Sequence, residues 1–254
     1  MIYIYDHSFE GFLSVVFEIY TSKTEPHKIC RQQDYQEVMF EQSTTIQTDS
    51  SRSDRVWQGL LKKLGKNARQ LPFLAFQSGE PGIEMDLYHL IRLAFQGNSP
   101  VEENYSDPKI LAVRNAAQKV VREAHRMMQF IRFQRTLDNI YFAPISPRYD
   151  VISMILPHFA DRFADQQWLI YDLERDYGFF FDRHSLQEVV LHEKSFHATD
   201  GVVEAGMVHE EETAYQSMWK GYCKNISIRE RMNLKLQKQH MPKRYWKFLP
   251  EMIR

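Results

Sequence analysis

The apolar residues of the N-terminal half recur mostly at helical spacing. Residues 2–5 alternate like a short strand, and Asp6 and Ser8 follow where residues that cap a helix are favoured. Asp49 stands in the same position before a second apolar series. The pattern predicts strands at 2–5 and 44–48, and helices over 9–20, 50–64, 68–76 and 83–95.

Residues 108–128 form the most regular amphipathic stretch in the chain. Val113, Ala117, Val120, Ala124 and Met127 share one face, while polar and basic residues follow one another on the opposite face. After Met128 the apolar residues no longer recur at helical spacing. We therefore expect a hairpin there, with strands at 129–135 and 140–143 joined by a turn at 137–139.

The remaining pattern alternates between hairpins and helices. It predicts a helix opening at Pro147, a second hairpin pairing 168–172 with 178–182, and a helix from about Glu210. Tyr215, Trp219 and Tyr222 share one stripe of that last helix, and such a stripe is more typical of core than of a base-stacking surface.

These elements predict an α+β fold. The N-terminal half is helical with a short strand, and the C-terminal half consists of β-hairpins packed with helices. The chain has 254 residues, which suits either a single domain over 1–254 or two lobes, 1–105 and 106–254.

The amino-acid composition indicates the compartment in which the protein is expected and the kinds of ligand it is not expected to hold. Apolar residues make up 43% of the chain, enough for a core, yet no apolar run reaches the length of a membrane span or a signal peptide. The two cysteines lie far apart and the histidines show no metal-ligand spacing. We expect a cytoplasmic protein that binds no membrane, and no metal or cofactor held by this chain alone.

Positive charge is concentrated in two segments, although the whole chain sums to −1. Residues 109–135 hold seven Lys and Arg against one Glu, and residues 220–254 hold ten against two. Cations interleaved with aromatic rings suit nucleic acid, whereas a solvated basic helix is the alternative. The residues expected to contact nucleic acid are Arg114, Arg122, Arg126, Arg132, Arg162, Arg175, Arg231, Lys235, Lys243, Arg244 and Trp246.

A second group of polar residues lies among aromatics further along the chain. Arg132 is flanked by phenylalanines, and His158 and Arg162 are spaced to share a helix face. One interpretation is a cationic pocket that binds a phosphate or nucleotide. Trp168 would then stack on the ligand, and His158 and Asp172 would be the catalytic candidates. The other is structural, with Arg132 paired to a carboxylate such as Asp172 and His158 satisfied on its helix.

The familiar catalytic motifs are absent. Gly59 and Gly65-Lys66 are spaced one residue too far apart for a phosphate-binding loop, and Asn67 replaces the Ser or Thr that would bind magnesium. There is no nucleotide-binding glycine motif, serine elbow or kinase signature. Whether the chain is catalytic remains open at this stage.

Several long segments form extended motifs. They include YxYDxSFEGFL at Tyr3–Leu13, EPGIE at Glu80–Glu84, HFADRFxxQxWxIxD at His158–Asp172 and ERMNxKLQxxxMPKRYWxxLPE at Glu230–Glu251. With these motifs the chain resembles one uncharacterised bacterial family whose members are described as DNA metabolism or DNA repair proteins. The resemblance implies a DNA-related role beside a radical-SAM partner with a helix-hairpin-helix motif. Some relatives carry a fused uracil-DNA glycosylase-like domain, whose activity we do not expect from these 254 residues.

Three functional hypotheses follow from these observations. The leading hypothesis is an accessory protein for DNA repair or modification that binds nucleic acid through its basic segments and works with the radical-SAM partner. The second is an enzyme acting on a nucleic-acid component through the Arg132, His158, Arg162 and Asp172 group. The third is an interaction module whose basic face docks an acidic partner protein.

Overall fold

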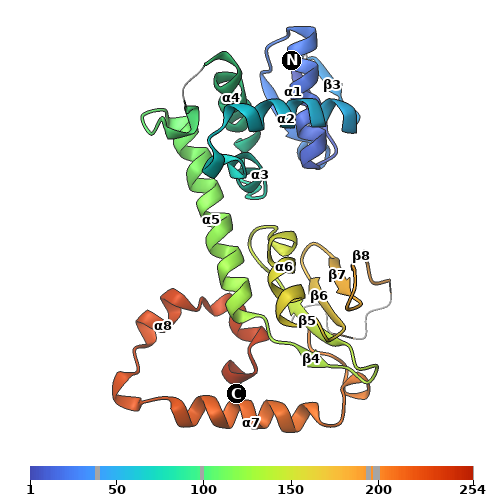
Figure 1. Ribbon diagram of the computed structural model, residues 1–254, viewed down its shortest axis with the longest axis vertical. Helices are drawn as coiled ribbons and strands as arrows, with labels where there is room; N and C mark the ends of the chain where they lie inside the picture. The colour runs from blue at the N-terminus through green and yellow to red at the C-terminus, as the bar shows by residue number, and fades with distance from the viewer. Residues whose placement is uncertain (38–40, 98–99, 193–195, 197–200, 254) are drawn as a thin grey trace. The chain divides into compact units, whose positions relative to one another are not determined.

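The computed structural model describes residues 1–37, 41–97, 100–192, 196 and 201–253 and shows the α+β fold expected from the sequence (Figure 1). The chain divides into two compact units, Met1–Val121 (unit 1) and Arg122–Arg254 (unit 2). The boundary falls within the long helix α5 (Pro108–Phe130), whereas the lobe boundary expected from the sequence lies just before that helix begins.

Unit 1 contains a three-stranded parallel sheet in the order β2-β1-β3. The strands are β1 (Ile2–Tyr5), β2 (Lys28–Arg31) and β3 (Ser43–Thr45). The central strand pairs on both sides, with Ile2 opposite Lys28 and Ser43. All four residues of β1 are buried, as a strand covered on both faces requires.

Helices form the rest of unit 1 and enclose its core. They are α1 (Phe9–Ser22), η1 (Gln32–Asp34), α2 (Ser50–Lys63), η2 (Lys66–Ala68), α3 (Leu71–Phe76), α4 (Ile83–Gln96) and η3 (Val101–Glu103), followed by the first half of α5. The two expected caps are confirmed, because the side chain of Ser8 accepts from Gly11 N and that of Asp49 from Arg52 N.

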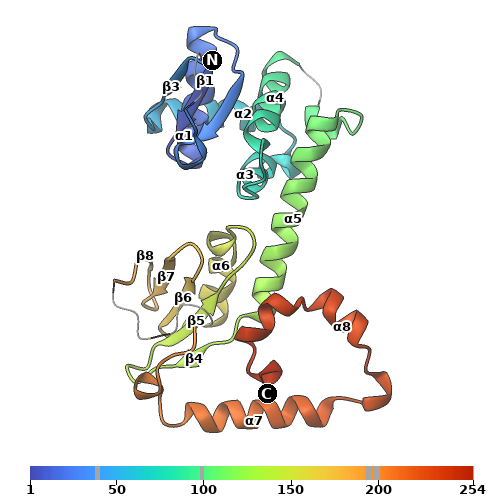
Figure 2. The same ribbon diagram turned by 180° about the vertical axis from the view of Figure 1, so that it is seen from behind.

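Unit 2 contains a five-stranded mixed sheet in the order β4-β5-β6-β7-β8 (Figure 2). The strands are β4 (Gln134–Arg135), β5 (Tyr141–Ile145), β6 (Trp168–Asp172), β7 (Tyr177–Phe181) and β8 (Leu186–Val189). Strands β5 and β6 are parallel and α6 (Ile152–Arg162) connects them, while the other pairs are antiparallel. Both expected hairpins are therefore present.

The C-terminal part of unit 2 is helical. It comprises η4 (Ala205–Met207), α7 (Glu212–Ile226), η5 (Arg229–Arg231), α8 (Leu234–His240), η6 (Lys243–Phe248) and η7 (Pro250–Met252). Segment η7 packs against α7, and Tyr245 and Leu249 are buried.

Several expected element boundaries are wrong. The strand predicted at 44–48 spans Ser43–Thr45, and the helix predicted at 68–76 begins only at Leu71. The strand predicted at 129–135 is reduced to Gln134–Arg135, because α5 continues to Phe130 and the buried stripe of Val120, Ala124, Met127 extends to Ile131. The helix predicted from Pro147 begins only at Ile152. The carbonyl oxygens of Pro147 and Arg148 accept hydrogen bonds from Arg175 instead of forming a first helical turn.

The aromatic stripe on α7 is also not core. Tyr215 is 54% exposed, Trp219 38% and Tyr222 55%. Among the described residues of α7 only Glu212 is buried. Helical periodicity identifies one apolar face, but it does not show that another element covers it.

Candidate nucleic-acid interface

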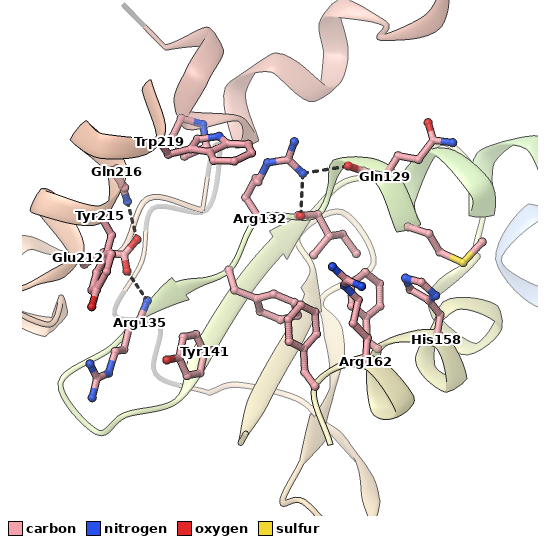
Figure 3. Close-up of a pocket in the computed structure, with 16 residues that line it drawn as sticks. Gln129, Arg132, Arg135, Tyr141, His158, Arg162, Glu212, Tyr215, Gln216 and Trp219 are labelled. Carbon is pink, nitrogen blue, oxygen red and sulfur yellow. Dashed lines mark hydrogen bonds between the residues drawn. The ribbon is translucent and has the colours of Figure 1, made fainter. Parts of the chain in front are cut away.

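The largest concentration of predicted site residues surrounds a hollow of about 580 Å³ in unit 2, here named the main hollow (Figure 3). The end of α5, the segment after it, β5, α6, α7 and η7 all contribute. It is lined by Met128, Gln129, Ile131, Arg132, Phe133, Arg135, Tyr141, His158, Phe159, Arg162, Phe163, Glu212, Tyr215, Gln216, Trp219 and Pro250.

The floor of the main hollow is aromatic. Phe133 meets the rings of Phe159 and Phe163 edge-on, with centroids 5.6 and 5.4 Å apart, and lies 6.3 Å from buried Trp168. Phe159 faces the core because it belongs to the apolar stripe of α6. Trp168 is thus part of the core beneath the hollow and does not form the stacking surface expected from the sequence.

His158 and Arg162 lie one turn apart on the exposed face of α6 and project side by side toward the main hollow (Figure 3). The Arg162 guanidinium lies 5.7 Å from the centre of the Phe163 ring. Neither side chain forms an ion pair with a carboxylate in the described part of the chain. Both therefore remain available to an anionic ligand.

Arg132 is fixed by protein partners. Its Nη2 donates to Glu251 Oε1 at 2.8 Å, and Nη1 donates to the carbonyl oxygens of Gln129 and Ile131. The guanidinium also lies over Trp219, 5.6 Å from the ring centre. The expected pairing with Asp172 is therefore wrong, although Arg132 does line the main hollow.

Asp172 lies away from the hollow, at the end of β6, and is fully buried. Its Oδ1 accepts from the backbone N–H groups of Glu174 and Arg175, and its Oδ2 accepts from Arg175 Nη1 at 2.8 Å. Burial raises the pKa of Asp172, and the contacts with Arg175 oppose that shift. Asp172 and Arg175 thus stabilise the β6–β7 turn, and the structure does not bring Asp172 to His158.

Arg135 and Glu212 complete one wall of the main hollow and were not singled out from the sequence. The backbone N–H of Arg135 donates to Glu212 Oε2 at 3.1 Å, and Gln216 donates to Glu212 Oε1. The Arg135 guanidinium is held by Asn139 and Glu211. Only the basic count over 109–135 pointed to Arg135, since its carboxylate partners are 76 and 77 positions away.

A second hollow, of about 450 Å³, shares Gln129 with the main hollow. It is lined by Arg122, His125, Arg126, Gln129, Phe130, Gln237, His240 and Met241. Arg122 is exposed, and the Arg126 guanidinium lies 3.8 Å from Glu123. Because Gln129 borders both, the cations of α5 continue those of the main hollow.

A third hollow, of about 460 Å³, collects cations from the C-terminal segment. It is lined by Ser146, Arg148, Glu174, Lys243, Arg244 and Lys247. Arg244 donates to buried Glu123 at 2.6 Å, whereas Lys243 is exposed. Trp246 is half-buried and donates to the Met241 carbonyl, so its indole N–H serves the fold.

The other expected contact residues lie elsewhere. Arg231 and Lys235 are exposed on η5 and α8. Arg114 belongs to unit 1, where its guanidinium donates to the Glu102 carbonyl and lies over Tyr105.

No cluster of three or more His, Cys, Asp or Glu side chains suited to a metal occurs in the described part of the chain. Cys30 and Cys223 are both free thiols. Within the same described residues, each helix is either too short or too polar to cross a bilayer.

Comparison with known proteins gives one match. The model of a family described as a domain of unknown function, DUF4130, matches residues 81–251. The matched range includes every residue that lines the main hollow. No match is found among curated proteins or among solved structures.

Proposed function

The chain belongs to the DUF4130 family of domains of unknown function, and we propose from the geometry of unit 2 that it binds a single strand of nucleic acid in the main hollow. The observation that carries the proposal is the exposed pair of His158 and Arg162, which has no carboxylate partner among the described residues and stands beside aromatic rings. Cations hold phosphates, and ring faces stack on bases.

The aromatic surface at the main hollow suits unpaired bases. Tyr215 is 54% exposed and Trp219 is 38% exposed, so α7 presents aromatic rings at the main hollow. Bases in a duplex are stacked on each other and cannot reach such rings. The second hollow extends the cationic surface by Arg122 and Arg126, which suits a strand longer than one nucleotide.

The family resemblance guides the biological setting of this proposal. We propose DNA as the nucleic acid, a role in DNA repair or modification, a cytoplasmic location, and a radical-SAM protein as partner. An enzyme built on His158 and Asp172 is not favoured, because both Asp172 oxygens are occupied within the β6–β7 turn.

Fluorescence anisotropy with single-stranded and duplex oligonucleotides across a salt series tests the strand-binding proposal. Single strands should bind more tightly than duplexes, and Arg162→Gln should lower the salt slope by about 0.7. Tyr215→Ala should weaken binding by roughly five- to a hundredfold with little change in slope, since it removes a stacking face.

Arg183→Gln is the matched control, because Arg183 is an exposed arginine of unit 2 outside the three hollows. It should bind like the unaltered protein. Absence of binding at about 50 mM salt, where phosphate contacts are strong, would refute the proposal.

A second observation favours partner docking by the same protein. Seven large apolar side chains of α7, α8 and the segment between them lie outside the main hollow and are each 50–62% exposed; together they are named the docking face and comprise Met218, Tyr222, Ile226, Ile228, Met232, Leu234 and Leu236. Lys220, Lys224, Arg231, Lys235 and Lys238 are interleaved with them. Such a face disfavours a second copy by charge repulsion and fits an apolar protein surface with an acidic rim.

The radical-SAM protein implied by the resemblance is the partner we propose for the docking face. Co-expression followed by size-exclusion chromatography should give a complex that Met218→Glu together with Met232→Glu disrupts. Leu137→Glu, at a 48% exposed apolar position in the β4–β5 turn, should leave the complex intact. Equal retention of all variants, or a dimer of this chain alone, would contradict this assignment.

A further inference from the structure

Unit 1 contains a hollow of its own, of about 590 Å³, that the proposed function does not use. It is formed by η2 and α3 on one side and by η3 and the first turns of α5 on the other. It is lined by Gly65, Lys66, Asn67, Ala68, Gln70, Leu71, Leu74, Glu102, Glu103, Tyr105, Leu111, Arg114, Asn115 and Gln118.

Glu102 is the unusual residue of this unit 1 hollow. It is 3% exposed, and its Oε1 accepts a hydrogen bond of 2.7 Å from the Gly65 backbone N–H. Its Oε2 is buried and has no hydrogen-bond partner in the described part of the chain. Buried carboxylate oxygens normally accept a hydrogen bond. Glu102 Oε2 could accept one from a ligand bound in the hollow.

The glycine beside it makes this arrangement possible. A Cβ added at Gly65 would lie 2.7 Å from Glu102 Oε1, so a side chain at this position would displace the carboxylate from the Gly65 N–H. The Gly65 N–H is therefore occupied by a carboxylate. This agrees with the rejection of Gly65-Lys66 as a phosphate-binding loop, since that N–H would otherwise have to meet a phosphate.

The rest of the lining supplies hydrogen-bond donors. Arg114 does not neutralise the Glu102 carboxylate; its Nη1 donates to the Glu102 carbonyl at 2.8 Å, and its guanidinium lies 4.6 Å from the centre of the Tyr105 ring. Four side-chain amides also line the hollow: Asn67, Gln70, Asn115 and Gln118. The lining also holds Glu103, which is exposed, so the hollow has a buried and an exposed carboxylate. A ligand that fits must therefore donate to the buried Glu102 carboxylate and accept from amide and cationic donors.

We propose that the unit 1 hollow binds a guanine base. The guanine edge presents N1–H and the N2 amino group together, which matches a carboxylate, while O6 and N7 accept from amides. Adenine and cytosine place a ring acceptor beside their amino group, and thymine flanks its N–H with two carbonyls. A guanidinium side chain offers no acceptor, and Arg114 and Lys66 would repel it.

The proposal concerns unit 1 and stands apart from strand binding in the main hollow. Calorimetric titration of the full chain with the four deoxynucleoside monophosphates tests it. The guanine nucleotide should bind most tightly. The inosine nucleotide, which lacks the N2 amino group, and the N1-methylguanine nucleotide should each bind about tenfold more weakly or worse, because each loses a hydrogen bond to a charged group.

Glu102→Gln should weaken guanine binding by at least about tenfold, since the amide presents a donor where an acceptor is needed. Glu37→Gln, an exposed carboxylate of unit 1 outside the hollow, should have no effect. Arg162→Gln should also retain guanine binding, which distinguishes this site from the main hollow.

If Glu102→Gln does not fold, the series of base analogues on the unaltered protein still decides the question. Equal affinity for all four nucleotides, inosine binding as tight as guanine binding, or displacement of the guanine nucleotide by arginine amide would each overturn the proposal. Absence of saturable binding would do so as well.

Discussion

Arg132 and Glu251 are joined by a hydrogen-bonded ion pair of 2.8 Å, although 119 positions separate them in the sequence. The other Glu251 oxygen accepts from the indole N–H of Trp219 at 2.9 Å. One carboxylate from η7 therefore joins the segment after α5 to α7. These contacts hold together two walls of the main hollow before any ligand binds.

Removing Arg132 should destabilise unit 2. The Glu251 side chain is only 10% exposed, so Arg132→Ala leaves a largely buried charge without its cation. Because Arg132 itself is 26% exposed, we expect a loss of about 1–3 kcal/mol, less than for a fully buried pair. Thermal unfolding followed by circular dichroism measures the effect.

The double variant Arg132→Ala with Glu251→Gln should be less destabilised than the sum of the two single variants, because residues in direct contact couple. The remaining glutamine can still accept from Trp219. Strict additivity would mean that the pair contributes nothing to unit 2.

Lys243 and Arg244 are neighbours, yet substitution of Arg244 should destabilise the protein far more than substitution of Lys243. Arg244 donates to Glu123, whose side chain is 2% exposed, so Arg244→Ala should lower the unfolding free energy by about 1–3 kcal/mol. Lys243 is exposed, and Lys243→Ala should change stability by less than about 0.5 kcal/mol. Chemical denaturation distinguishes the two; similar losses would show that the Glu123 contact is unimportant.

The local elements of this fold could be predicted because their signals lie within a few residues. The caps Ser8 and Asp49 and the hairpin that pairs Trp168 with Phe181 follow from cap preference, alternation and turn residues. The parallel pairing of β5 with β6 did not follow, since it depends on how α6 crosses the sheet. Strands β2 and β8 were not recognised, since neither KICR at Lys28–Arg31 nor LQEV at Leu186–Val189 alternates apolar and polar residues.

The sequence predicted several residues of the candidate site, but it did not predict which side chains pair with one another. The sequence identified Arg132, His158 and Arg162, and these do line one hollow. It could not show that Arg132 pairs with Glu251 and Asp172 with Arg175, because charge pairing between distant segments depends on tertiary structure. The exposure of Trp219 was missed for the same reason, since apolar spacing identifies a face and not what lies against it.

Asp107 should contribute to the acid sensitivity of unit 1. The hydrogen bond from His89, 2.8 Å long, lowers the pKa of Asp107; burial opposes the shift, and the backbone N–H groups of Lys109 and Ile110 add to it. Because the pKa of Asp107 is lower in the folded state than in the unfolded state, ionised Asp107 stabilises the fold. This stabilisation is fully present above the unfolded-state pKa of about 3.9, and it is lost as the pH falls through the folded-state pKa.

Asp107→Asn should therefore reduce the loss of stability that occurs as the pH falls below about 4, while the amide still caps α5. Hydrogen exchange of residues 1–121 along a pH series measures this loss. Asp54→Asn changes an exposed carboxylate of α2 and is the control. An unchanged acid limb in Asp107→Asn would show that other groups dominate the acid unfolding of unit 1.

The strongest single-residue effect on unit 1 should come from Arg31. Arg31 Nε and the Tyr5 hydroxyl both donate to Glu84 Oε1 at 3.1 Å, and the side chains of Arg31 and Glu84 are 11% and 8% exposed. Arg31→Met leaves the Glu84 charge buried with only a hydroxyl donor. We expect a cost of about 3–5 kcal/mol, against about 1–2 kcal/mol for Tyr5→Phe.

Two comparisons make this prediction specific to a buried charge. Arg31→Met with Glu84→Gln removes both charges and should recover much of the lost stability. Arg52→Met removes an arginine that is 45% exposed and pairs with Glu18 and Asp49, and it should cost less than about 1 kcal/mol. Hydrogen exchange in β1 and α4 reports on unit 1 alone, and similar exchange in Arg31→Met and Arg52→Met would contradict the argument.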